Sequence, residues 1–137
     1  MWWLYALLSA FFAALVAVFA KIGIKGVDTD LATAIRTVVI LVIAWGIAIF
    51  RGGVTTINTL TQQNILFLCL SGVATGLSWI FYFKALQLGK VSQVAPVDKM
   101  SVAIAILLAV IFLGETLTLK AGIGAGLIII GTLLLIS

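Results

Sequence analysis

Residues 91–113 read VSQVAPVDKMSVAIAILLAVIFL, and this stretch decides the fold. Its length suits a helix that crosses a membrane, because a spanning helix needs about 20 mostly apolar residues. The same apolar run carries Pro96, Asp98 and Lys99. Ionisable side chains are costly in lipid and normally face a protein interior or a water-filled cavity. The stretch therefore predicts a membrane helix that bears a functional site.

Four further apolar runs accompany this stretch, one behind the other along the chain. Together they predict five transmembrane helices, at residues 2–20, 31–50, 64–83, 91–113 and 121–136. The connections between these runs are too short to hold a soluble domain. We therefore predict an all-α integral membrane fold with a single domain over residues 1–137. No basic residue precedes the first run, so we expect a spanning helix there and not a cleaved signal peptide.

The composition excludes a soluble protein. Of the 137 residues, 64% are hydrophobic and 9% are charged, whereas soluble domains are about 45–50% apolar and about 25% charged. The net charge of +4 does not indicate binding to nucleic acid, because the eight Lys and Arg residues stand singly between apolar runs. With no histidine and one cysteine, Cys69, the sequence offers no metal-ligand cluster and no nucleophile–base pair. We expect no enzyme, no cofactor and no metal.

Charged residues gather toward one side of the membrane. Four of the predicted helices bring charge to the same third of the bilayer: Lys21, Arg36, Lys84, and Asp98 with Lys99. Lys21 and Lys84 can snorkel to the interface, whereas the short side chain of Asp98 needs a partner or a substrate. Asp98 and Lys99 are adjacent, hence about 100° apart around a helix. We therefore expect Asp98 to pair with Arg36 or Lys21, and not with Lys99.

Pro96 marks an irregular point in the same helix. A proline inside a helix leaves the carbonyl four residues earlier, that of Ser92, without its backbone donor, so a kink or break is expected. Such irregular helices line binding sites in membrane transporters. Ser101 lies three residues after Asp98 and shares its helix face. Asp98, Lys99 and Ser101 are accordingly candidate site residues.

Aromatic residues cluster at the end of the third predicted helix. Trp79 and Tyr82 are candidates for the wall of a binding site, with anchoring at the membrane interface as the alternative. For Phe81 and Phe83 we favour interfacial anchoring.

Small residues indicate where helices approach each other closely. Gly122, Gly124 and Gly126 form a dense glycine motif on the last helix, and we expect a subunit interface there. The alternative is packing within one subunit, which we favour for Gly72 and Gly76 on the third helix.

The insertion direction is only weakly indicated. Loop Lys and Arg residues number two on the side of the N-terminus and four on the other side. The positive-inside rule then places the N-terminus outside and the C-terminus inside. Since the excess is small, insertion in both directions stays open.

Several short segments carry a family resemblance. The stretch Val94–Ser101, followed by Phe112-Leu113-Gly114-Glu115-Thr116, resembles the EamA-type repeat of the drug/metabolite transporter superfamily. Residues 20–23 and 78–86 resemble the same family's ends of helices one and three. The resemblance covers essentially the whole chain. It implies that Glu115 is structural, capping the short loop or the helix that follows.

The resemblance also implies an architecture. Full-length members carry two five-helix repeats of opposite orientation, and this chain resembles the half-length, five-span members of bacteria and archaea. It implies one EamA-type repeat in the inner membrane of a bacterium or archaeon, pairing with a second copy in an antiparallel homodimer. Small multidrug exporters of the superfamily carry an embedded glutamate on helix one. Residues 2–20 here carry no charge, which argues against a cationic drug as substrate.

The leading functional hypothesis is a secondary transporter that moves a small metabolite by alternating access. Embedded basic residues outnumber Asp98, which favours an anionic or zwitterionic substrate such as an amino acid or organic acid, and an arginine can bind both oxygens of a carboxylate. The alternatives are a proton-coupled exporter of cationic compounds that uses Asp98, and a channel or non-transporting scaffold subunit. The expected partners are the substrate, the lipid bilayer and a second copy. The substrate and coupling residues are predicted to be Asp98, Arg36, Lys99, Lys21, Ser101, Trp79 and Tyr82.

Overall fold

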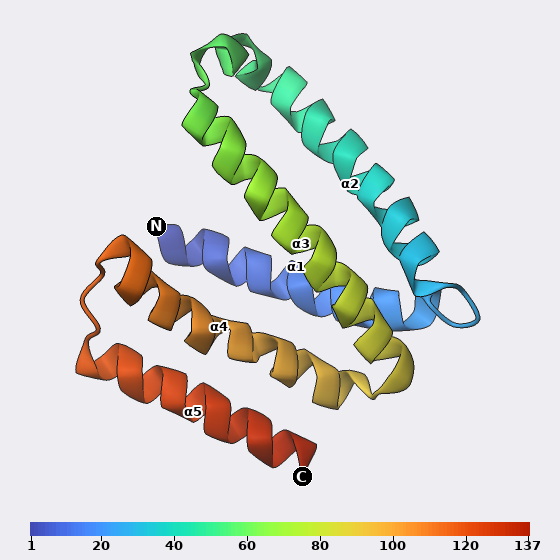
Figure 1. Ribbon diagram of the computed structural model, residues 1–137. Coiled ribbons are helices and arrows are strands. Elements are labelled where there is room, and N and C mark those ends of the chain that lie inside the picture. Colours follow the sequence, from blue (N-terminus) through green and yellow to red (C-terminus); the bar gives the residue numbers. More distant parts are fainter. The chain divides into compact units, whose positions relative to one another are not determined.

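The computed structural model describes residues 1–137, which form six helices and no strands (Figure 1). The helices are α1 (Trp2–Gly23), α2 (Thr29–Phe50), the short 3₁₀ helix η1 (Gly53–Thr59), α3 (Gln62–Leu88), α4 (Val91–Leu113) and α5 (Leu119–Ile136). All except η1 are long and apolar enough to cross a membrane. The prediction of an all-α fold with five spanning helices is confirmed.

The helices extend beyond the apolar runs that predicted them. Only α4 begins and ends at the predicted residues, and α3 continues five residues past Phe83, to Leu88. The difference arises because hydropathy marks where lipid contact stops, whereas backbone hydrogen bonding continues through polar residues. Lys21 and Lys84, predicted to lie in connections, are consequently helical.

The helix η1 was not predicted from the sequence. Its threonines hold it together, since the hydroxyls of Thr55, Thr56 and Thr59 donate to carbonyls three residues back at 2.7, 2.8 and 2.7 Å. Threonine hydroxyls compete for backbone carbonyls in this way wherever regular structure is weak.

Local chemistry fixes where the long helices begin and end. Asp28 caps α2, because its carboxylate accepts from the N–H groups of Asp30 and Leu31 at 3.0 Å each. Gly114 ends α4 in the left-handed region at φ 67°, and the N–H of Glu115 then donates to the Ala109 carbonyl at 3.3 Å. This bond uses the backbone of Glu115, and a structural role for its side chain stays a prediction. The residue that caps α5 is Thr118 and not Glu115, since the Thr118 hydroxyl accepts from the Ala121 N–H.

The chain divides into two compact units, residues 20–87 and residues 1–19 with 88–137, and each is described by itself. In the second of these, α4 and α5 pack side by side (Figure 1). In the unit of residues 20–87, the buried apolar side chains are those of Ile24, Phe83 and Leu86.

Most other large apolar side chains lie on the surface. Phe50 is 97% exposed and Leu119 is 82% exposed, and similar residues occur along every long helix. Water does not tolerate apolar surface on this scale, whereas lipid does. The protein is a multi-pass membrane protein whose outer surface is in contact with the bilayer.

Candidate functional site

The guanidinium group of Arg36 lies against two aromatic rings. Its Cζ atom is 4.4 Å from the centroid of the Trp79 ring and 4.9 Å from that of Phe83. Trp79 and Phe83 are four residues apart on α3, so both rings lie on one helix face. Both distances are within the range of a cation–π interaction. Three residues from two helices thereby form one cluster, which we call the arginine cluster.

One nitrogen of the arginine cluster has no acceptor. Nη1 of Arg36 is buried from solvent and makes no hydrogen bond. A buried N–H group without a partner is costly, more so when the group is charged, and buried polar atoms are normally satisfied. The hydrogen-bonding capacity of Nη1 is therefore unused within the chain.

The aromatic residues of α3 have different surroundings. Phe83 is 1% exposed, so the expectation that it anchors at the membrane interface is wrong. It belongs to the core because its ring packs on Arg36. Phe81, two residues away, is 71% exposed, as an anchoring residue would be. The Tyr82 ring is half-buried and lies 6.2 Å from the Phe83 ring between centroids.

Lys21 makes a contact with the end of α3. Its ammonium group donates to the Leu86 carbonyl, in the last turn of the helix. The Gln87 side chain of α3 in turn donates to the Val27 carbonyl, in the segment after α1, at 3.1 Å. Carbonyls in the last turn of a helix lack intrahelical partners, and cations bind them well. Lys21 thus has a structural contact, and its part in substrate binding stays a prediction.

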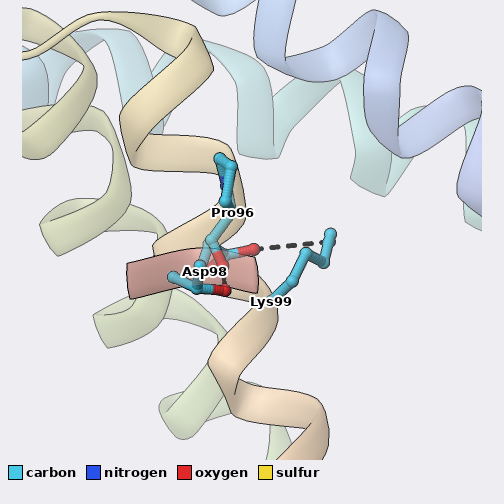
Figure 2. A network of polar contacts seen from close by, with 4 residues as sticks. Pro96, Asp98 and Lys99 are labelled. Carbon is cyan, nitrogen blue, oxygen red and sulfur yellow. Dashed lines mark hydrogen bonds and ion pairs between the residues drawn. The ribbon is translucent and has the colours of Figure 1, made fainter. Parts of the chain in front are cut away.

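Asp98 and Lys99 pair with each other, contrary to expectation (Figure 2). Lys99 Nζ lies 3.4 Å from Asp98 Oδ2, and the two side chains are 57% and 35% exposed. The angle of about 100° between the two residues does not exclude the pair, because that angle describes only where the side chains leave the backbone. The four-carbon stem of a lysine is long enough to fold back on its neighbour.

The predicted partners of Asp98 lie elsewhere in the chain. Arg36 and Lys21 belong to the unit of residues 20–87, whereas Asp98 belongs to the other unit. Pairing of Asp98 with either residue stays a prediction. Ser101 is exposed one turn further along α4.

A threonine of α5, Thr132, contacts α4 at Pro96. Thr132 Oγ1 lies 3.1 Å from the Pro96 carbonyl oxygen, and the Thr132 side chain is buried. The sequence analysis missed this residue. The available signal was a single polar residue within the apolar run 127–136.

The glycines of α5 have open space around them. A Cβ atom added at Gly122, Gly124 or Gly126 would meet nothing within 4 Å. Packing within their own compact unit therefore does not explain why these residues are glycine. The same holds for Gly72 and Gly76 on α3, where internal packing was favoured. The subunit interface predicted at α5 stays a prediction.

An apolar groove of about 370 Å³ lies between α4 and α5 near Gly114. Its polar lining residues are Glu115 and Thr116, and neither Asp98 nor Lys99 lines it. No three side chains of the metal-ligating types lie together in the structure.

Five spanning helices, with charged residues and a proline inside them, define a multi-pass membrane protein with ionisable groups in its spans. The chain belongs to the EamA-like transporter family, whose model matches residues 1–137. The resemblance seen in the sequence is thereby confirmed. Membership of this family points to a transporter and away from an enzyme.

Two relatives extend this result. The chain is 48% identical over 134 residues to a Sinorhizobium protein named "Uncharacterized transporter in cobO 3'region", and the match covers 98% of this chain and 95% of that protein. It is 42% identical over 77 residues to an uncharacterised protein of Methanocaldococcus jannaschii, with 56% of each chain covered. No solved structure matches the chain.

Proposed function

We propose that the protein is a secondary transporter for a small metabolite that carries a carboxylate, such as an amino acid or organic acid. The observation that carries the proposal is the unpartnered Nη1 of Arg36. A carboxylate oxygen would satisfy this nitrogen, and a planar guanidinium can bind both oxygens of a carboxylate at once.

The surroundings of Arg36 support the same substrate class. Contact with the Trp79 and Phe83 rings holds the guanidinium group in place. Its edge, where the N–H groups point, is the part left for a ligand. Burial strengthens the attraction between the guanidinium group and an anion, because the surrounding dielectric constant is lower than that of water.

The charge within the spanning helices also favours an anion or zwitterion. The cations in the spanning helices are Lys21, Arg36, Lys84, Lys99 and Lys120, against the carboxylates of Asp30 and Asp98. We assign Asp98 to coupling, with Lys99, Ser101 and Tyr82 as further contacts of the substrate or the coupling ion. The helix α4 runs through Pro96 without the break that the sequence led us to expect, but the proline removes one backbone hydrogen bond, and we propose that α4 flexes there during alternating access.

The proposed working unit is an antiparallel homodimer. Inverted repeats place a transport site at their interface, and one five-span chain supplies a single repeat. The weak charge bias between the two sides of the membrane permits both insertion directions. The open glycines Gly122, Gly124 and Gly126 of α5 offer a close-packing surface to the second copy. Since the two relatives come from a bacterium and an archaeon, we place the protein in the cell (inner) membrane of such an organism.

Electrogenic transport by the purified protein in liposomes tests the proposed function. Zwitterions, organic anions and quaternary cations are offered in turn under a pH gradient, beside the variant Asp98→Asn. We expect currents with zwitterions or anions that vanish in the variant. Currents with cations alone would overturn the proposal in favour of a proton-coupled exporter of cationic compounds. Non-saturable flux that does not depend on Asp98 would instead indicate a channel.

A further inference from the structure

Thr132 stands out among the residues of α5. The helix Leu119–Ile136 is apolar apart from Lys120 near its start and Thr132 near its end. The Thr132 side chain is 3% exposed. A hydroxyl group in such surroundings is costly unless it donates a hydrogen bond. Its bonding partners therefore matter.

The Thr132 hydroxyl has two acceptors within reach. Its Oγ1 lies 2.8 Å from the Ile128 carbonyl on its own helix and 3.1 Å from the Pro96 carbonyl on α4. A hydroxyl carries one proton and donates it to one acceptor at a time. The bond to Ile128 already satisfies the hydroxyl, as the equivalent bonds of Thr33 and Thr75 do in α2 and α3. The bond to Pro96 is thus an alternative to the bond to Ile128, and it links two helices.

The link reaches α4 at the point where that helix is weakest. Pro96 has no N–H group, so one rung of the helical hydrogen-bond ladder is missing there. Kinks and changes of helix direction concentrate at such positions. Asp98 and Lys99, which pair with each other, follow within one turn. A hydrogen bond that holds the Pro96 carbonyl in place therefore also holds the direction in which the Asp98–Lys99 pair projects from α4.

We propose that Thr132 is a positioning residue for Asp98, acting through the Pro96 carbonyl. When the Thr132 hydroxyl donates to the Pro96 carbonyl, the backbone that carries Asp98 is held against α5. When the hydroxyl donates to the Ile128 carbonyl instead, α4 is free to move and the hydroxyl still has an acceptor. The importance of this positioning for transport rests on the proposed function, in which Asp98 is the coupling residue.

Labelling of Asp98 by dicyclohexylcarbodiimide, a hydrophobic reagent for protonated carboxyl groups, tests the proposal without any substrate. Thr132→Val removes the hydroxyl while it keeps the shape of the side chain. The Asp98–Lys99 pair then loses its fixed placement, so the Asp98 carboxyl group is accessible to the reagent for more of the time. We expect labelling of the intact protein, followed by mass spectrometry, to speed up by about fivefold, the effect of one lost hydrogen bond.

Two variants control the experiment. Thr132→Ser retains the hydroxyl and is expected to label at the original rate. Thr75→Val removes a threonine hydroxyl that bonds only along its own helix in the structure, to the Ser71 carbonyl at 2.8 Å, and is expected to leave the rate unchanged. Thr132→Ala repeats the test with a smaller side chain if the valine variant does not fold.

Two results would overturn the positioning role. One is an unchanged or slower labelling rate in both hydroxyl-free variants at position 132. The other is an equal increase in Thr75→Val, which would mean that any lost hydroxyl loosens the protein. A protein that transports none of the tested solutes, yet labels faster in Thr132→Val, would leave the positioning role standing while the proposed function failed.

Discussion

The guanidinium group of Arg36 makes two aromatic contacts and still leaves one nitrogen without an acceptor. A cation in contact with a ring gains about 0.5–2 kcal/mol, depending on how far it is desolvated. That gain helps to offset the cost of keeping the charge away from water. It does not supply the missing hydrogen bond of Nη1, which the carboxylate of the proposed substrate would accept.

Trp79 should therefore affect substrate affinity through Arg36. Trp79→Leu removes the closer ring, and the loss of about 1 kcal/mol of cation–π energy corresponds to an increase in KM of about fivefold. Trp79→Phe keeps a ring and should have a smaller effect. The measurement is the initial rate of uptake of a carboxylate substrate against its concentration. Trp45→Leu, at an exposed position of α2, is the matched control, and an equal rise in KM there would contradict the account.

The sequence identified Arg36, Trp79 and Asp98 as candidates because charge and large aromatic side chains are conspicuous in apolar runs. Their contacts required the structure. Which residues of α2 and α3 meet depends on how the two helices are aligned, and no pattern in one helix gives that alignment. The pairing of Asp98 with Lys99 was missed because side-chain length was ignored, and Thr132 because a lone threonine is common in spanning helices.

At the scale of helices, short polar segments decide where each span begins and ends. The apolar interiors of the helices would tolerate small shifts along the membrane normal. A capping side chain, in contrast, binds particular backbone N–H groups and so fixes where the helix begins. Hydropathy located all five spans but gave both ends correctly only for α4. The caps at Asp28 and Thr118, and the left-handed Gly114, depend on backbone geometry that only the structure gives.

Asp28 should contribute measurably to stability. Asp28→Ala leaves two N–H groups at the start of α2 without their acceptor, and such a loss costs about 1 kcal/mol. The expected result is a lower midpoint of thermal unfolding in detergent. Asp28→Asn retains a capping oxygen and should unfold close to the original temperature. A midpoint that is equal in the alanine and original proteins would show that this cap contributes nothing.

Gly114 should tolerate substitution less well than a helical glycine. Its φ of 67° lies in the region that side chains disfavour, so Gly114→Ala should destabilise the protein by about 1–2 kcal/mol. Gly131→Ala, within α5, places a Cβ in open space and should be neutral or stabilising by up to about 1 kcal/mol. Thermal unfolding of the two variants side by side measures the difference. The reverse order of stability would mean that α4 does not end as described.

At the scale of the whole molecule, one chain is a single five-helix repeat of a transporter family. The composition and the five apolar runs predicted the spanning helices, whereas the family and the single repeat came from the resemblance carried by short segments such as Val94–Ser101. How two copies of the chain contact each other was not predictable in the same way, because small residues favour close helix packing but do not indicate which helix packs against them. The open glycines of α5 are the feature that makes the question testable.

Enlarging the α5 glycines should separate the copies. Gly122→Ile and Gly126→Ile fill space that the chain itself leaves open, so they should weaken a dimer without disturbing the fold of one subunit. Light scattering of the protein in detergent gives the molar mass of the particle. Gly46→Ile on α2, also in open space, is the control. A dimer that survives both α5 substitutions, or dissociates equally with the control, would place the interface elsewhere.

Recognition of a carboxylate by Arg36 is the central claim, and one comparison tests it most directly. Uptake into liposomes is measured for an amino or organic acid that the protein transports and for the amide of the same compound, with the original protein, Arg36→Lys and Arg36→Gln. We predict that the original protein strongly prefers the acid, that lysine retains the charge but loses most of the preference, and that glutamine loses it entirely. Equal preference for the acid in all three proteins would contradict the account.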